Sequence, residues 1–170
     1  GPLSLVLDTR DGPFEIRLAE LDVPESAAES ARAWLLARLE GEAVRLGYDG
    51  LRRDRYDRAI AQAYRVEDGE WLQAALVEAG QARVLSHAGN RQAAAALLEL
   101  EAAARRAGLG LWADPANHVR DTHPDALAQD IGSVQLVEGR VLEVTRLRSG
   151  RTYINFGTDY RTDFTLVVES

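Results

Sequence analysis

The hydrophobic pattern changes once near the start of the chain, and this change constrains the fold more than any other feature. Apolar and polar residues alternate over residues 3–22, on both sides of the turn signal at 11–13, which predicts a β-hairpin. Ser26 with Glu29 three residues later has the pattern of a capping box, and apolar residues then recur at helical spacing up to Leu39. The chain is therefore predicted to begin with strands that lead into a helix.

The remaining elements follow in an order that is typical of one small fold. Strands are predicted over residues 42–49 and 58–66, and helices over residues 70–80 and 90–108, with Asn90 as the cap of the last one. The predicted order is three strands, a helix, two strands and two helices. A small β-barrel with a helix between its third and fourth strands is the OB-fold pattern, so the predicted fold class is a β-barrel with helices (α+β).

Three regions divide the sequence. Residues 3–115 hold the predicted OB-fold domain, and residues 116–132 are predicted to be a linker because Pro, His and Asp replace the periodic patterns. Residues 133–170 are β-rich, with strands predicted at 136–146, 151–156 and 163–169. Because three strands are too few to close a barrel of about five, this region is predicted to be a partial, OB-like extension. It either packs on the first domain or is part of a larger one, and its apolar last strand is expected to pair with another segment.

The composition excludes several kinds of site. The net charge of −7 argues against a protein that coats nucleic acid by general attraction, although it is compatible with a local basic cleft. The absence of Cys excludes disulfides and thiolate metal sites. His87, His118 and His123 are far apart and lack the spacing of metal ligands. All 20 basic residues are Arg, a side chain that binds phosphate with two parallel hydrogen bonds.

Three charged residues surround the end of the first hairpin. Arg17 lies on the second predicted strand, Asp22 at its exit and Glu25 at the first turn of the helix. Phosphodiester hydrolysis needs such a set, because a metal ion and an Arg neutralise the phosphate while a carboxylate positions or deprotonates the attacking water. The alternative is structural: Glu25 favours the helix N-terminus and Asp22 forms a turn.

A second cluster combines basic residues with an aromatic one. Tyr56 lies among Arg52, Arg53, Arg55 and Arg58. Basic residues interleaved with an aromatic ring suit a phosphate chain with a base or sugar beside it. The alternative is a solvated connection between strands, in which neighbouring Asp residues offset the positive charge.

Four segments carry a family resemblance, and they occur in the order IRLAELDVPE, DRYDRAIA, DGEWLQAALVEAGQARV and LLELEAAARRAGLGLW. Together they resemble the staphylococcal nuclease-like, or thermonuclease, family over residues 3–115. The resemblance implies an OB barrel with helices and a Ca²⁺-dependent phosphodiesterase, an endonuclease that hydrolyses DNA or RNA. It implies that Arg17 and Arg58 hold the phosphate and that Glu25 acts as general base for the water.

The same resemblance implies a metal site and a nucleotide contact. Asp22 matches a calcium ligand, and Val23 matches a position that offers its backbone carbonyl to the metal. Arg55 and Tyr56 match positions that contact the terminal phosphate of the nucleotide.

Several departures from the family pattern affect this site. Leu3 stands where the family has a second calcium-binding Asp, and a hard cation that loses one of two carboxylates binds more weakly. Ser86 and Ala88 stand near the places of two tyrosines that line the base pocket, and Asp57 replaces a Gly inside the Arg motif. The calcium site is therefore expected to be weak and the base pocket altered.

The C-terminal segment TYINFGTDYRTDFTLVV resembles an extension found after some bacterial nuclease domains of this family. Its Arg and aromatic residues form either a second nucleic-acid surface or an ordinary β-sheet core: Arg140, Arg146, Arg148, Arg151, Tyr153, Phe156, Tyr160 and Arg161.

Two classes of function remain open for the chain. The first is an active nuclease. The second is a catalytically degenerate OB-fold module that binds nucleic acid or a protein partner. A protein partner or a second copy of the chain is expected at the C-terminal β segment, no membrane partner is expected, and the resemblance implies an exported, periplasmic or extracellular protein.

Overall fold

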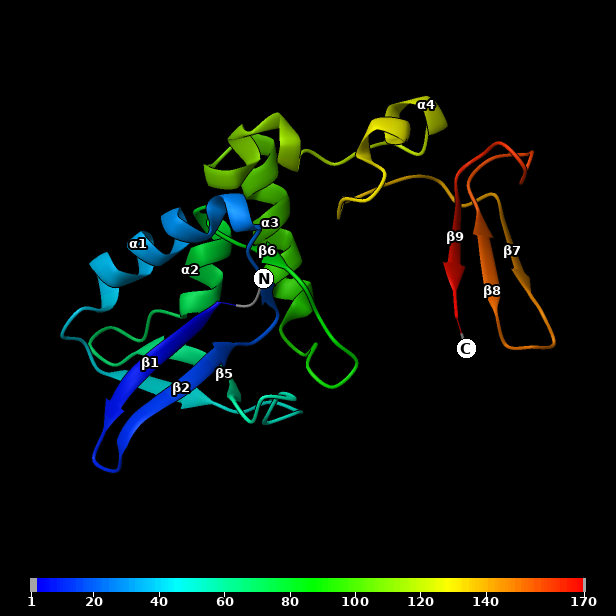
Figure 1. Cartoon of the computed structure of the whole chain (residues 1–170). Coiled ribbons are helices and arrows are strands. Elements are labelled where there is room, and N and C mark those ends of the chain that lie inside the picture. The colour runs from blue at the N-terminus through cyan, green and yellow to red at the C-terminus, as the bar shows by residue number, and fades with distance from the viewer. Residues whose placement is uncertain (1–2, 170) are drawn as a thin grey trace. The chain divides into compact units, whose positions relative to one another are not determined.

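The computed structural model describes residues 3–169, whose contacts form two compact units that divide between Asp114 and Pro115. Figure 1 shows the order of the elements along both units. Among the described residues, no helix has both the length and the apolar character needed to span a membrane.

A four-stranded sheet forms the base of the N-terminal unit, with the strand order β1-β2-β5-β4 (Figure 1). These strands are β1 (Ser4–Thr9), β2 (Gly12–Leu18), β4 (Val44–Gly47) and β5 (Ala59–Arg65). The predicted hairpin is confirmed: β1 and β2 are antiparallel, with Ser4 opposite Arg17 and Thr9 opposite Gly12. β5 runs parallel to β2 and antiparallel to β4.

A separate two-stranded sheet joins β3 (Leu21–Asp22) to β6 (Arg83–Val84) and places Asp22 opposite Arg83. The predicted mixture of strands and helices is confirmed, but the described strands lie in separate sheets that do not close into one barrel. The prediction that the strands close into a barrel was therefore wrong. β3 and β6 have only two residues each, so their ladder ends before it can connect the edges of the larger sheet.

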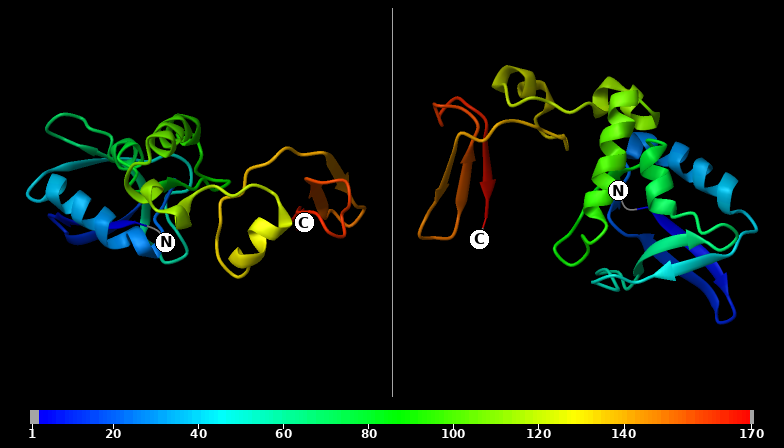
Figure 2. Two further views of the ribbon diagram at one scale, coloured as in Figure 1. Left: turned by 90° about the horizontal axis from the view of Figure 1, so that it is seen from above. Right: turned by 180° about the vertical axis from the view of Figure 1, so that it is seen from behind.

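Three helices lie on the same side of the large sheet (Figures 1 and 2). They are α1 (Ala28–Leu39), α2 (Leu72–Glu78) and α3 (Ala94–Ala107), with the 3₁₀ turns η1 (Glu25–Ala27) and η2 (Gly110–Ala113) before α1 and after α3. Gly108 ends α3 in the left-handed conformation, as is common for a residue without a Cβ.

The two predicted helix caps were wrong. α1 begins after the η1 turn with Ala27 at its N-cap, and no side chain caps it. α3 begins at Ala94, so Asn90 lies outside the helix. The Asn90 side chain instead exchanges hydrogen bonds with the backbone of Leu51.

Large apolar side chains from the sheet and all three helices form one core. Its Leu and Ile members that are at most 2% exposed are Ile16, Leu18, Leu21, Leu35, Leu72, Leu76 and Leu97. Leu3 belongs to the same core and is 8% exposed. The position at which the family resemblance places a second acid is therefore occupied by a packed apolar side chain.

A buried amide connects α2 to β5. The Gln73 side chain accepts a hydrogen bond from the Ala63 N–H at 3.1 Å and donates one to the Ala61 carbonyl at 2.9 Å. The pairing of β2 with β5 ends at Leu18 and Ala61, so the Ala63 N–H lies beyond the last strand pair on that edge. Gln73 thus supplies the partner that the neighbouring strand does not reach.

The C-terminal unit contains short helices followed by a three-stranded antiparallel sheet in the order β7-β8-β9. Its elements are η3 (Pro115–Asn117), α4 (Pro124–Leu127), η4 (Ala128–Asp130), β7 (Glu143–Arg146), β8 (Thr152–Asn155) and β9 (Thr165–Val168). The region predicted to be a linker thus carries helical turns. Within it Arg120 contacts Asp130 and the His118 carbonyl, and it also contacts the carbonyl of Pro115, which precedes the region.

Some aromatic residues of this unit pack against each other, and others are exposed. The Phe156 and Phe164 rings lie 5.4 Å apart, whereas Tyr160 is exposed, with the Arg161 guanidinium 5.4 Å from its ring. Arg151 forms an ion pair with Glu169. Three strands alone do not identify an OB fold, so the OB-like extension and its nucleic-acid surface stay predictions.

Candidate functional site

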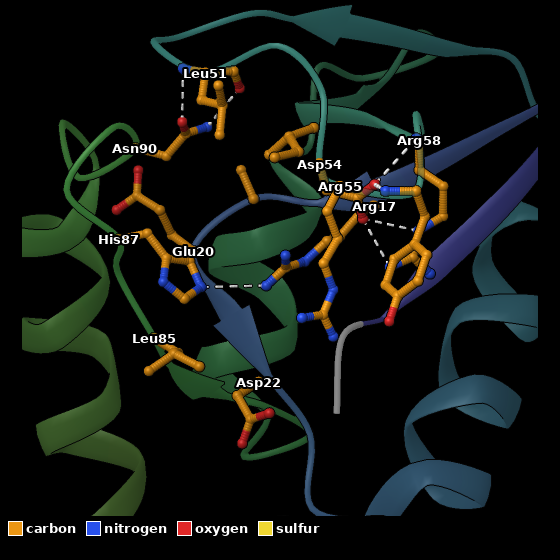
Figure 3. A pocket seen from close by; sticks show the side chains of 13 residues that line it. Arg17, Glu20, Asp22, Leu51, Asp54, Arg55, Arg58, Leu85, His87 and Asn90 are labelled. Atoms are coloured by element: carbon orange, nitrogen blue, oxygen red, sulfur yellow. Dashed lines mark hydrogen bonds and ion pairs between the residues drawn. The ribbon is translucent and has the colours of Figure 1, made fainter.

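A pocket of about 420 Å³ opens on the N-terminal unit beside β2 (Figure 3). It is lined by residues from β2, β3 and the turn between them, from β5 and the loop before it, and from the loop after β6: Arg17, Ala19, Glu20, Asp22, Leu51, Asp54, Arg55, Tyr56, Arg58, Ile60, Leu85, His87 and Asn90. Five of the seven predicted site residues are among them; Val23 and Glu25 are not.

Arg17 reaches the pocket because of strand alternation. Ile16 and Leu18 are buried in the core, so the side chain between them lies on the opposite face of β2. Its Nη2 lies 3.3 Å from Nε2 of His87 in the loop after β6. Figure 3 shows this contact extending from the arginine-rich side of the pocket to the side that carries His87.

Arg58 is held by an acid from its own loop. Its Nη2 and Nε lie 2.7 and 2.8 Å from Oδ2 of Asp54, whose side chain is only 6% exposed. Oδ1 of Asp54 accepts the backbone N–H groups of Tyr56 and Arg58. Burial raises the pKa of the Asp54 carboxyl, but the hydrogen bonds from Arg58 and from these N–H groups outweigh it, so its pKa lies below the ordinary value.

The loop also presents an exposed aromatic ring to the pocket. Tyr56 is 64% exposed, and the guanidinium carbons of Arg55 and Arg58 lie 4.8 and 5.2 Å from its ring centroid. Asp57 adopts a positive φ of 63°, which explains why a Gly suits this position in the family pattern. Arg52 and Arg53 from the same cluster do not line the pocket.

Asn90 fixes the two pocket loops to each other. Its side chain accepts the Leu51 N–H at 2.7 Å and donates to the Leu51 carbonyl at 3.2 Å, so it pairs with the backbone as a strand would. The loops approach so closely that a Cβ on Gly50, which has φ of 82°, would lie 1.8 Å from the Gly89 carbonyl oxygen. A glycine is therefore required where the loops meet.

Asp22 lies in the pocket, but its charge is already compensated. Its Oδ2 is 2.9 Å from Nε and 2.8 Å from Nη2 of Arg83, the residue opposite it in the β3–β6 pair. Burial raises the pKa of the Asp22 carboxyl, but hydrogen bonds and positive charge, those of Arg83 among them, outweigh burial and lower its pKa.

These residues do not fit a calcium ion. Calcium takes six to eight oxygen ligands, several of them usually carboxylates. In residues 3–169 no three acidic or His side chains gather as a metal site, Leu3 is packed in the core, and Arg83 neutralises Asp22. Val23 as a whole residue, backbone included, is only 3% exposed and belongs to the core. Residues 3–169 therefore offer calcium no complete site.

Glu25 lies near the pocket in sequence but does not line it. It begins the η1 turn, its side chain is exposed, and it follows Asp22 by three residues. The structure thus brings Arg17, Asp22 and Arg58 together and leaves the proposed general base at the surface.

Glu20 is a pocket residue that the sequence analysis missed. It is 4% exposed and has a positive φ of 61°. Its Oε1 accepts the Ala93 N–H at 3.2 Å and the Gln62 Nε2 at 3.4 Å, and its Oε2 is buried without a hydrogen-bond partner among the described residues. Burial raises the pKa of the Glu20 carboxyl. The hydrogen bond from Ala93 lowers this pKa, and the negative charge of Asp49 raises it further. The only local signal was an acid within an apolar strand pattern.

The raised pKa of Glu20 predicts a pH-dependent stability. A carboxyl whose pKa is higher in the folded state stabilises the fold below its unfolded-state pKa, and this stability is lost as pH rises through the folded-state pKa. Glu20→Gln is therefore expected to be more stable than the wild type at neutral pH, with the difference disappearing in acid. Urea unfolding followed by Trp fluorescence, from neutral to acidic pH, measures the difference in stability between the two proteins. A Glu20→Gln variant that is less stable than the wild type at neutral pH would contradict the prediction.

His87 and Asn90 were also not predicted as pocket residues. His87 lies between Ser86 and Ala88, which are exposed and do not line the pocket. The imidazole thus contributes to the wall where the family resemblance expected tyrosines. No spacing pattern links His87 or Asn90 to Arg17, so only the fold could reveal them.

Comparison with known protein families gives a match within the N-terminal unit. The family model described as "Staphylococcal nuclease homologue" matches residues 15–114, which include every residue that lines the pocket. No curated protein matches the chain. Since the match covers more than half of the 170 residues, the chain belongs to the staphylococcal nuclease family.

Proposed function

We propose that the pocket binds a phosphodiester group of nucleic acid, DNA or RNA. Membership of the family supports nucleic-acid binding and nuclease-like activity. The observation that carries the proposal is that Arg17 from β2 and Arg55 and Arg58 from the loop before β5 line the same pocket. Convergent guanidinium groups suit a phosphate because each can donate two hydrogen bonds to its oxygens.

Arg17 and Arg58 have different roles in this proposal. Within residues 3–169, the Arg17 side chain contacts His87, and no carboxylate lies within ion-pair distance of its guanidinium. Arg17 can therefore donate to a phosphate without first breaking an ion pair. Arg58 is already oriented by its ion pair with Asp54, so its remaining N–H groups can donate to a phosphate with little further ordering cost. Tyr56 offers its ring to a base or sugar.

Phosphodiester hydrolysis is a second candidate function. It is supported by family membership and by the presence of Asp22 in the pocket, whereas Glu25 lies at the surface at the start of η1. Arg17 and Arg58 would stabilise charge on the phosphate, and Glu25 would position or deprotonate water. Family members are typically calcium-dependent. The ligands proposed for calcium in this chain, Asp22 and the Val23 carbonyl, do not complete a site.

Arg17→Ala is expected to weaken binding of a labelled single-stranded DNA oligonucleotide about tenfold, because it removes a charge-assisted hydrogen bond worth about 1.5 kcal/mol. Fluorescence anisotropy with the full chain at fixed salt measures the effect. Arg10→Ala is the matched control, because Arg10 lies in the turn at the opposite end of the β1–β2 hairpin. Equal losses in both variants would show only general attraction and would contradict the proposal.

A cleavage assay separates binding from hydrolysis. The same oligonucleotide is incubated with the wild type and with Glu25→Gln, in the presence of calcium and of a chelator. Cleavage that Glu25→Gln abolishes supports hydrolysis by the proposed base. Binding without cleavage under every condition supports a binding module and excludes the second candidate.

A further inference from the structure

An ion pair occupies the position at which the family resemblance places a metal ligand. Asp22 and Arg83 are partners in the β3–β6 ladder, and both side chains are largely buried, at 17% and 13% exposure. Two guanidinium nitrogens contact the same carboxylate oxygen of Asp22. The register of the strands fixes this contact, because residues directly opposite each other hold their side chains about 5 Å apart.

The pair changes the charge that the pocket presents to a ligand. An unpaired Asp22 would repel a phosphate and attract a cation, but the guanidinium cancels its charge. Leu3 contributes no charge at the position of the second acid. Calcium affinity depends on the number of charged ligands, so a neutral pair gives the ion little to bind. A guanidinium keeps its charge at all relevant pH values and needs no dissociable ion.

We propose that the Arg83 guanidinium takes the electrostatic role of a divalent cation at Asp22, so that the pocket binds a phosphodiester without a metal ion. The inference rests on the proposed function for its ligand, whereas its statement about calcium stands independently. Arg83 compensates Asp22 from β6, while Arg17 and Arg58 remain in the pocket for the phosphate.

Calcium binding by the wild type is the first test, and it needs neither a variant nor nucleic acid. The full chain is titrated with calcium chloride by isothermal titration calorimetry. No saturable heat and no calcium-dependent rise in thermal midpoint are expected up to millimolar calcium. Saturable binding of one ion per chain would overturn the proposal.

Nucleic-acid binding is the second test. Wild-type affinity for a single-stranded DNA oligonucleotide is expected to differ less than about twofold between calcium and chelator at matched ionic strength. Arg83→Gln exposes the charge of Asp22 and is expected to bind on the order of tenfold more weakly in chelator, with part of the loss recovered in calcium. The matched control is Arg38→Gln, which removes an Arg paired with Glu70, outside the pocket lining.

A double variant guards against a folding defect in Arg83→Gln. Asp22→Asn combined with Arg83→Gln restores a neutral pair and is expected to bind more tightly than Arg83→Gln in chelator. A double variant as weak as the single one, or wild-type binding that requires calcium, would overturn the proposal. If the wild type binds no oligonucleotide in either buffer, the proposed function fails, and the calcium titration still decides whether Arg83 has displaced the metal.

Discussion

Replacing Arg58 with alanine is expected to lower the free energy of unfolding by about 2–3 kcal/mol, because it leaves the nearly buried Asp54 carboxylate without its counter-charge. The loss falls somewhat below that of a fully buried pair because the Arg58 side chain is 20% exposed. Oligonucleotide affinity is expected to fall as well, since a pocket cation is removed. Urea unfolding measures the first effect, and anisotropy below the unfolding transition measures the second.

Arg53→Ala provides a matched control for this prediction. Arg53 and Asp57 form another Arg–Asp pair with a separation of four residues, in the same loop, but their side chains are 54% and 84% exposed. An exposed pair contributes up to about 1 kcal/mol, so the control is expected to change little. Equal losses in the two variants would show that burial of Asp54 does not matter.

The Arg58 prediction also has a pH signature. A carboxyl with a lowered folded-state pKa contributes stability above its unfolded-state pKa and loses it as pH falls through the folded-state pKa. The stability difference between the wild type and Arg58→Ala is therefore expected to be largest near neutral pH and to narrow in acid. A difference that is constant with pH would indicate lost packing instead of a lost ion pair.

Replacing Gln73 with leucine is expected to destabilise the N-terminal unit by about 2–3 kcal/mol. Leucine has a similar volume but cannot accept the Ala63 N–H, which becomes a buried donor without a partner. The Ala61 carbonyl loses one bond but keeps its second, from the Ala19 N–H. Because Trp34, Trp71 and Trp112 all lie in this unit, Trp fluorescence during urea unfolding reports its stability.

Gln92→Leu is the control for Gln73→Leu, since Gln92 is exposed and precedes α3. Its effect is expected to stay within about 0.5 kcal/mol. A change below about 1 kcal/mol for Gln73→Leu would mean that water or a backbone shift satisfies the Ala63 N–H.

Local patterns in the sequence determined much of the N-terminal unit. The alternation around the 11–13 turn was sufficient for the β1–β2 hairpin, because side chains on a strand point to alternate faces. The same alternation placed the Arg17 side chain on the face of β2 that points away from the core. Gly108 indicated the end of α3, because only a residue without a Cβ adopts the left-handed conformation at little cost. The order of the four sequence motifs was sufficient to recognise the family.

The tertiary structure alone decided the partners of these groups. Asp22 and Arg83 are 61 positions apart and meet only because β3 pairs with β6 in one register. His87 meets Arg17 across 70 positions, and Asn90 joins Leu51 instead of capping a helix. Contacts of this kind depend on how separate segments pack together. The sequence near each residue carries no information about this packing. The sequence thus determined which charged groups the site has, and packing decided which of their charges are already neutralised.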